Sequence, residues 1–229
     1  MAGAFSLEGR KALVTGANTG IGQAIAVSLA GQGAHVICAG RRACDETVAE
    51  ISAAGGSGES LLLDFADPMA ARDVFDGAGI SILVNNAGII RRADSVEYSE
   101  ADWDDVMDVN LKALFFTCQA FGKALLAQGE KGAVINIASL LSFQGGIRVP
   151  AYTAAKHGVA GVTKILANEW APHGITVNAI APGYIATNNT QALRDDPERS
   201  AAILDRIPAG RWHDLAHRAH VEVADGDGT

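Results

Sequence analysis

A tyrosine and a lysine four positions apart, Tyr152 and Lys156, form a pattern that can do proton chemistry. Residues at i and i+4 share one face of a helix, so the lysine ammonium can lie beneath the tyrosine ring. A free tyrosine has a pKa of about 10 and is ionised to about 0.1% at pH 7. A cation at about 5 Å, with an effective dielectric constant of about 20, favours the ionised form by about 3 kcal/mol. The pair therefore predicts a tyrosine that exchanges a proton with a substrate.

Ser139 precedes this pair and follows directly on an apolar run, 133–138, that reads as a strand. Ligands of open α/β sheets bind at the carboxyl ends of the strands, where the Ser139 hydroxyl can bond the same substrate oxygen as Tyr152. Taken singly, the three residues are an ordinary helical tyrosine, a surface lysine and a strand-end serine. Together with a glycine loop they favour catalysis.

That glycine loop is the segment 15–22, TGANTGIG, between the first apolar run and the first helical pattern. Glycines allow a pyrophosphate to approach the backbone closely, and the following helix offers free N–H groups and the positive end of its dipole. A glycine-rich turn can also be purely structural. Its position between a strand and a helix favours dinucleotide binding.

The elements that must position these residues alternate between short apolar runs and longer helical patterns, which is typical of βαβ units in a parallel sheet. We expect strands at 11–15, 35–39, 60–63, 81–85, 133–138 and 175–180, and helices at 21–31, 45–54, 68–75, 100–128 and 151–171. Ser99 is expected to cap the fourth helix, with Asp102 in its first turn. The predicted fold is α/β, a doubly wound Rossmann-type parallel sheet flanked by helices in a single domain, 1–212, followed by an atypical tail, 213–229.

Composition excludes several classes of protein. The chain of 229 residues has 48% hydrophobic and 19% charged residues, which is globular rather than disordered. A net charge of −8 argues against a nucleic acid or an anionic membrane as partner. Three cysteines without a CxxC spacing suggest neither disulfides nor zinc, and we expect a cytoplasmic protein without a metal. His213, His217 and His220 could form a metal-binding face, but a solvated cluster is the favoured interpretation.

With these motifs the sequence resembles the short-chain dehydrogenase/reductase family, from Leu7 to about Trp212. The resemblance implies that Tyr152 is the acid/base, that Ser139 polarises the carbonyl, and that Lys156 lowers the tyrosine pKa and holds the cofactor ribose. It also implies that Asn110, in DVNL, keeps a proton-relay water. Members are expected to be homo-oligomers, commonly tetramers.

The resemblance further implies a nicotinamide cofactor, NAD(H) or NADP(H). Where members often carry an aspartate for the ribose, this chain has Gly40 followed by Arg41 and Arg42, so a 2′-phosphate and hence NADP(H) is slightly favoured. The alternative is that Arg41 stacks on adenine or faces water. The implied cofactor-binding residues are Gly16, Asn18, Thr19, Gly20, Ile21, Gly22, Arg41, Asp64, Phe65, Asn86, Ala87, Gly88, Tyr152, Lys156, Pro182, Gly183, Ile185 and Thr187.

Stretches outside the general motifs, such as NNAGIIRR and SLLSFQGGIRVPAYTAAK, resemble the subgroup of 2-deoxy-D-gluconate and 2-dehydro-3-deoxy-D-gluconate dehydrogenases. This resemblance implies a small keto sugar acid as substrate. Its carboxylate needs a cation and its hydroxyls need polar partners. Arg148 with Gln144 is the first candidate, and Arg91 and Arg92 are the second, with solvent exposure or subunit contact as the alternative for all three arginines.

The sequence after Trp212 departs from the family, because neither its apolar helix nor its last strand is recognisable. We therefore expect a sheet that lacks the usual last strand, an exposed sheet edge and a weakened tetramer, as in a truncated or frameshifted ending. Two other functions stay open. One is a 3-oxoacyl thioester reductase of the same family, which would need an apolar groove, and the other is a catalytically impaired nucleotide-binding scaffold.

Overall fold

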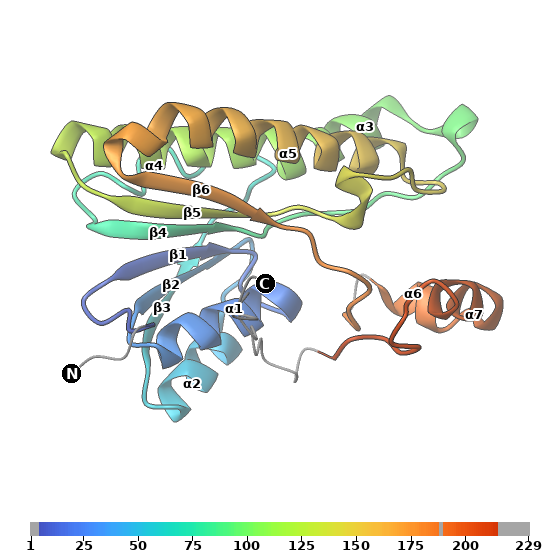
Figure 1. The fold of residues 1–229 in the computed structure, drawn as a ribbon, viewed down its shortest axis with the longest axis horizontal. Helices are drawn as coiled ribbons and strands as arrows, with labels where there is room; N and C mark the ends of the chain where they lie inside the picture. Colours follow the sequence, from blue (N-terminus) through green and yellow to red (C-terminus); the bar gives the residue numbers. More distant parts are fainter. Residues whose placement is uncertain (1–4, 188–189, 215–229) are drawn as a thin grey trace, which may run out of the picture. The chain divides into compact units, whose positions relative to one another are not determined.

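The computed structural model of the chain describes residues 5–187 and 190–214 and contains one parallel sheet (Figure 1). The strand order is β3-β2-β1-β4-β5-β6, with every neighbouring pair parallel. Chain order reverses between β1 and β4, and the carboxyl ends of these two strands mark the place where open α/β sheets bind ligands. The strands are β1 (Lys11–Thr15), β2 (His35–Gly40), β3 (Ser57–Leu62), β4 (Ile80–Asn85), β5 (Gly132–Ile137) and β6 (Ile175–Ile180).

Strand β1 is buried on both faces, as a central strand of a parallel sheet must be. Ala12 and Val14 join one apolar cluster with α1 (Gly20–Gly31) and α2 (Asp45–Ala53), whereas Leu13 joins a second cluster on the opposite face. The three side chains are fully buried. The period of two along the strand thus decides which helices each residue meets.

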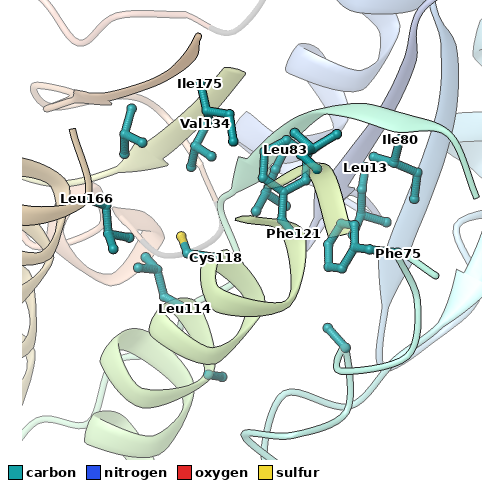
Figure 2. Packing of buried hydrophobic residues seen from close by; sticks show 14 of the residues in the cluster. Leu13, Phe75, Ile80, Leu83, Leu114, Cys118, Phe121, Val134, Leu166 and Ile175 are labelled. Atoms are coloured by element: carbon teal, nitrogen blue, oxygen red, sulfur yellow. The ribbon is translucent and has the colours of Figure 1, made fainter. Parts of the chain in front are cut away.

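Helices α4 (Ala113–Gln128) and α5 (Pro150–Trp170) cover the second face, and α3 (Glu100–Met107) lies beside α5 (Figure 1). Phe121 of α4 is the largest fully buried side chain, and it packs edge-to-face on Phe75 with ring centroids 5.5 Å apart. Figure 2 shows both rings against Leu13 and Leu83 of the central strands. The doubly wound parallel sheet predicted from the sequence is confirmed.

The segment 68–75 was expected to be a helix, and this prediction is wrong. The chain forms a series of turns there, with i to i+3 bonds such as Arg72 N to Met69 O at 3.0 Å. Side chains compete for the backbone donors, because Asp64 Oδ1 accepts from Ala66 N and Asp67 Oδ1 accepts from Met69 N. Such local bonds offer the backbone an alternative to a helix.

The predicted helix 100–128 is instead two α-helices joined by a π turn, η2 (Asp108–Lys112), which lies between α3 and α4. The expected cap is confirmed, since the Ser99 hydroxyl accepts a hydrogen bond from Asp102 N at 3.1 Å. Short helical turns complete this part of the chain: η1 (Ser95–Glu97), η3 (Leu140–Ser142) and η4 (Ala171–His173).

The chain divides into two compact units, 1–183 and 184–229. The second unit contains α6 (Gln191–Arg194) and α7 (Pro197–Leu204), and within it the rings of Tyr184 and Trp212 meet edge-to-face at 5.7 Å. The predicted boundary at residue 212 stays a prediction, because residues 215–229 of the tail lie outside the described residues.

Candidate active site

The glycine loop between β1 and α1 is packed so closely that side chains are excluded. A Cβ on Gly22 would lie 2.3 Å from the Gly16 oxygen and 2.4 Å from Asn86 Nδ2. Gly16 and Gly20 have positive φ angles of 64° and 63°, which favour glycine. The loop therefore brings bare backbone to the helix N-terminus, which is the arrangement that a pyrophosphate requires.

Thr15, which the sequence analysis did not single out, ties this loop to the segment after β4. Its hydroxyl accepts hydrogen bonds from Asn86 N and Ala87 N, both at 2.9 Å. In return Asn86 Nδ2 donates to the backbone oxygens of Thr15 and Gly16 at 3.0 and 3.1 Å. The only sequence signal is a threonine directly before the loop glycine. These bonds fix two predicted cofactor segments against each other, and the cradle fits a dinucleotide.

Arg41, Asp64 and Phe65, which the sequence also predicts to contact the cofactor, differ in how far their side chains are exposed. Arg41 is exposed directly after β2, and Asp64 is exposed two residues beyond β3. Phe65 is different, because its side chain is buried in the main apolar cluster. Only the Phe65 backbone is left for a nucleotide, so a side-chain contact is not supported.

The remaining predicted cofactor contacts lie after β6. Pro182 and Gly183 are the last residues of the first unit, whereas Ile185 and Thr187 belong to the second. Within the second unit, Thr187 N donates to the hydroxyl of Thr190 at 3.0 Å.

Ser139 follows β5 and caps the short helix η3. Its hydroxyl accepts from Leu141 N at 3.2 Å, and a side-chain hydrogen bond joins Ser139 to Tyr152 and lowers the tyrosine pKa. Ser142, which the sequence analysis missed, accepts from Ser139 N at 3.3 Å and donates to the Lys156 oxygen at 2.7 Å. The spacing of two serines around a helix start was the available signal. Ser142 thus connects the Ser139 turn to α5.

The Lys156 ammonium lies 5.6 Å from the centre of the Tyr152 ring, as the i, i+4 spacing predicts. Lys156 is buried, its Nζ donates to the Ile137 oxygen, and burial lowers its pKa to about 8. Burial also raises the pKa of Tyr152. The hydrogen bond with Ser139 and the charge of Arg92 lower this pKa, and they offset part of the rise. The expected lowering of the tyrosine pKa by Lys156 is therefore corrected: desolvation is the larger effect in this structure.

Asn110 lies in the π turn and is buried, with both side-chain groups engaged. Its Oδ1 accepts from Ile89 N and its Nδ2 donates to Ile89 O, each at 2.8 Å. A Cβ on Gly88 would approach Asn110 Oδ1 to 2.8 Å. The side chain thus positions the segment after β4, and the predicted water relay stays a prediction.

The candidate substrate cations are placed very differently. Arg91 pairs with two carboxylates of α3, those of Asp102 at 3.3 Å and Asp105 at 3.1 Å. Arg148 pairs with Asp94 at 3.0 Å. Both arginines thus have carboxylate partners in this chain.

Arg92 and Gln144 are both exposed. Arg92 is the arginine whose charge lowers the pKa of Tyr152, which places it within electrostatic range of that hydroxyl. The Arg92 charge thus acts on the Tyr152 hydroxyl, and the predicted substrate contacts of Arg92 and Gln144 stay predictions.

Residues 5–187 and 190–214 hold no group of three or more His, Cys, Asp or Glu side chains that could bind a metal. His217 and His220, two of the three histidines considered above, lie outside the described residues. Among the helices of the described segments, none combines the length and apolar character that crossing a bilayer requires.

Comparison with known proteins agrees with this geometry. Residues 10–198 match the family model for short chain dehydrogenase. The 2-dehydro-3-deoxy-D-gluconate 5-dehydrogenase of Escherichia coli (strain K12) is 57% identical over 214 residues, covering 91% of this chain and 85% of the relative. A 3-oxoacyl-[acyl-carrier-protein] reductase of Vibrio cholerae serotype O1 is 40% identical over 217 residues, covering 92% of this chain and 86% of the relative.

Among solved structures, one from Agrobacterium tumefaciens is described as a 2-deoxy-D-gluconate 3-dehydrogenase with bound NADP. It is 74% identical to this chain and superposes with a TM-score of 0.91, covering 92% of this chain and 86% of its own.

Proposed function

The chain belongs to the short chain dehydrogenase family, and we propose that it interconverts the hydroxyl and keto forms of a gluconate-type sugar acid, with NADP(H) as cofactor. The observation that carries the proposal is the Tyr152 site. There a partly buried tyrosine, hydrogen-bonded to Ser139, lies above a buried lysine and within range of the Arg92 charge. The two named relatives with the higher identities carry gluconate-type names.

When bound in the glycine cradle, the dinucleotide supplies the hydride donor or acceptor. In reduction, Tyr152 gives its hydroxyl proton to the substrate oxygen while Ser139 bonds that oxygen. In oxidation, Tyr152 takes the proton back. The raised pKa of Tyr152 keeps it protonated at neutral pH, which suits the reductive direction.

Arg92 is our candidate for the substrate carboxylate. The Arg92 charge lowers the pKa of Tyr152, so it acts on the proposed proton donor. A guanidinium recognises a planar carboxylate through two parallel hydrogen bonds. A sugar acid bound through Arg92 would therefore have its carboxylate close to the proton donor.

NADP(H) is supported by the end of β2. Gly40 has no carboxylate to repel a 2′-phosphate, and exposed Arg41 follows it. The Agrobacterium relative binds NADP. A homo-oligomer and a cytoplasmic location stay predictions from the family resemblance and the composition.

A second candidate function is the reduction of an acyl thioester. Val96 and Ile147 are apolar, 90% and 76% exposed, and lie on the two segments that carry Arg92 and Arg148. Such side chains could contact an acyl chain, and the Vibrio cholerae reductase is a 40% identical relative. The charged residues of these two segments, Arg92 and Arg148, favour the sugar acid.

The proposed mechanism is tested by Tyr152→Phe in a nicotinamide absorbance assay over keto sugar acids, acyl thioesters and simple ketones with both cofactors. We expect kcat for the preferred sugar acid to fall by about 10²- to 10⁴-fold, because the proton donor is lost. The Kd for NADPH should stay nearly unchanged. Tyr98→Phe, which also removes one phenol hydroxyl near the site, is the matched control. Preference for an acyl thioester, or full turnover by Tyr152→Phe, would reject the proposal.

A further inference from the structure

Ser142 lies on η3, between Ser139 and the start of α5, and it is 5% exposed. Its hydroxyl accepts a hydrogen bond from Ser139 N at 3.3 Å and donates one to the Lys156 oxygen at 2.7 Å. One buried hydroxyl therefore joins the backbone at Ser139 to the backbone of α5 at Lys156.

These two bonds fix a position rather than complete a strand or a helix. At the end of β5 the last sheet bond is made by Ala138 N, which donates to Ile180 O at 2.8 Å. Ser139 N is the next donor along the chain, and Ser142 supplies its acceptor. Lys156 lies in the interior of α5, where its oxygen has a second lone pair beside the helical bond. The Ser142 hydroxyl therefore adds a link that neither element requires for itself.

Lys156 is held at both ends as a result. Its backbone oxygen accepts from Ser142, and its Nζ donates to the oxygen of Ile137, the last residue of β5. The same ammonium lies 5.6 Å from the centre of the Tyr152 ring. The end of β5 and the part of α5 that carries the tyrosine are thus kept at one spacing by buried hydrogen bonds.

We propose that Ser142 is a positioning residue for the proton transfer, because its hydroxyl sets the spacing between the Ser139 turn and the part of α5 that carries Tyr152 and Lys156. This inference rests on the proposed function, since it concerns the same site. Proton transfer requires donor and acceptor within hydrogen-bond reach, so a small displacement of the turn slows the reaction.

Thr163 offers a matched comparison on the same helix. Like Ser142 it is buried, at 8% exposed, and its hydroxyl also accepts one hydrogen bond and donates one to an oxygen of α5. Asn136 Nδ2 donates to it at 3.0 Å, and it donates to Val159 O at 2.8 Å. Thr163→Val therefore also removes a buried link between β5 and α5, but one that lies about two turns beyond Lys156.

The inference is tested first by the kinetics of the preferred sugar acid. Ser142→Ala should lower kcat about tenfold and change KM less than about threefold, because a displaced proton donor affects the chemical step more than binding. Thr163→Val should lower kcat less than about twofold. In a Ser139→Ala background, Ser142→Ala should lower kcat by less than about a further twofold, because the hydroxyl that it positions is gone.

The pKa of Tyr152 gives a second readout, which needs no substrate. The hydrogen bond with Ser139 and the charge of Arg92 lower this pKa, and burial raises it. Lys156 lies beneath the ring, and Tyr98 belongs to the same apolar cluster. A change in the tyrosine pKa without a change in any of these charges therefore reports a displacement within the site.

Ser142→Ala removes an uncharged group, so it alters the tyrosine pKa by displacing Ser139 or Lys156. We expect the pKa to rise by about 0.5, because the hydrogen bond with Ser139 is weakened. Ultraviolet titration of each variant, referenced to the same variant with Tyr152→Phe, measures the rise. Thr163→Val should leave the tyrosine pKa within about 0.2 of the parent value.

The two measurements separate this inference from the proposed function. If no sugar acid is turned over but the tyrosine pKa rises in Ser142→Ala and not in Thr163→Val, the positioning role stands and the proposed function fails. The positioning role is overturned if the two variants agree in the tyrosine pKa, or if Ser142→Ala lowers kcat equally with and without the Ser139 hydroxyl. Thermal melting should show a similar fall for both single variants, about 2–8 °C, and a kcat that follows the melting temperature also overturns the role.

Discussion

The nucleotide cradle and the arginine-bearing segments of the substrate side are held by different forces. The cradle is held by sterics and backbone bonds: Gly22 admits no Cβ, and Thr15 accepts two bonds from the segment after β4. The substrate side is held by exposed ion pairs, such as that of Arg148 with Asp94. The first arrangement tolerates no change of shape, whereas the second can change its charges with little cost in stability.

The largest effect is expected where the cradle is tightest. Gly22→Ala forces a Cβ to within 2.3 Å of the Gly16 oxygen, so we expect a loss of about 2–3 kcal/mol in the free energy of unfolding and loss of NADPH binding. Gly161→Ala in α5 is the matched control, because no atom lies within 4 Å of its Cβ. It should gain about 0.5–1 kcal/mol. Thermal melting measures the stability of both variants, and fluorescence titration measures their binding of NADPH. An equal response of Gly22→Ala and Gly161→Ala would contradict the prediction.

The buried Lys156 ties stability to pH. Its pKa is about 8 in the folded protein against 10.5 for the free group, so between these values the unfolded state binds the additional proton. Stability of the parent should therefore rise with pH through this window, relative to Lys156→Met, by up to about 3 kcal/mol. The raised pKa values of Cys38, Cys118 and Tyr152 act in the opposite direction but are common to both proteins. Chemical denaturation between pH 7 and 10 measures the difference, and a difference that stays constant would contradict it.

The smallest effect on stability is expected at Arg41. Its charge is exposed, so changing it should cost as little stability as changing the exposed ion pairs of the substrate side. Arg41→Asp should shift the ratio of kcat/KM for NADPH over NADH by about tenfold or more towards NADH, because a charge-assisted phosphate contact is lost. Stability should change by less than about 0.5 kcal/mol. Arg72→Asp, at an exposed site remote in the sequence, is the control. If the ratio of kcat/KM for NADPH over NADH does not change, Arg41 does not contact the cofactor.

Local patterns in the sequence predicted most of the sheet and part of the site. Strands β1 and β6 begin and end at the predicted residues, because both are apolar runs bounded by turn residues. Strand β3 begins three residues earlier than its apolar run, since its pairing with β2 extends through the polar residues Ser57 and Glu59. The Ser99 cap and the Tyr152–Lys156 spacing were predictable because both depend on residues within one turn of helix.

What only the tertiary structure decided depends on partners distant in the sequence. The carboxylate partners of Arg91 and Arg148, Asp105 and Asp94, are recognisable only in the fold. The tyrosine pKa depends on burial, which no spacing reveals, and on Arg92 from another segment. The sequence by itself determined the fold, the glycine cradle and the helical tyrosine–lysine pair, because periodicity and steric demand are local. Folding decided which charges meet, because an ion pair forms between whichever side chains the packing of distant elements brings within reach.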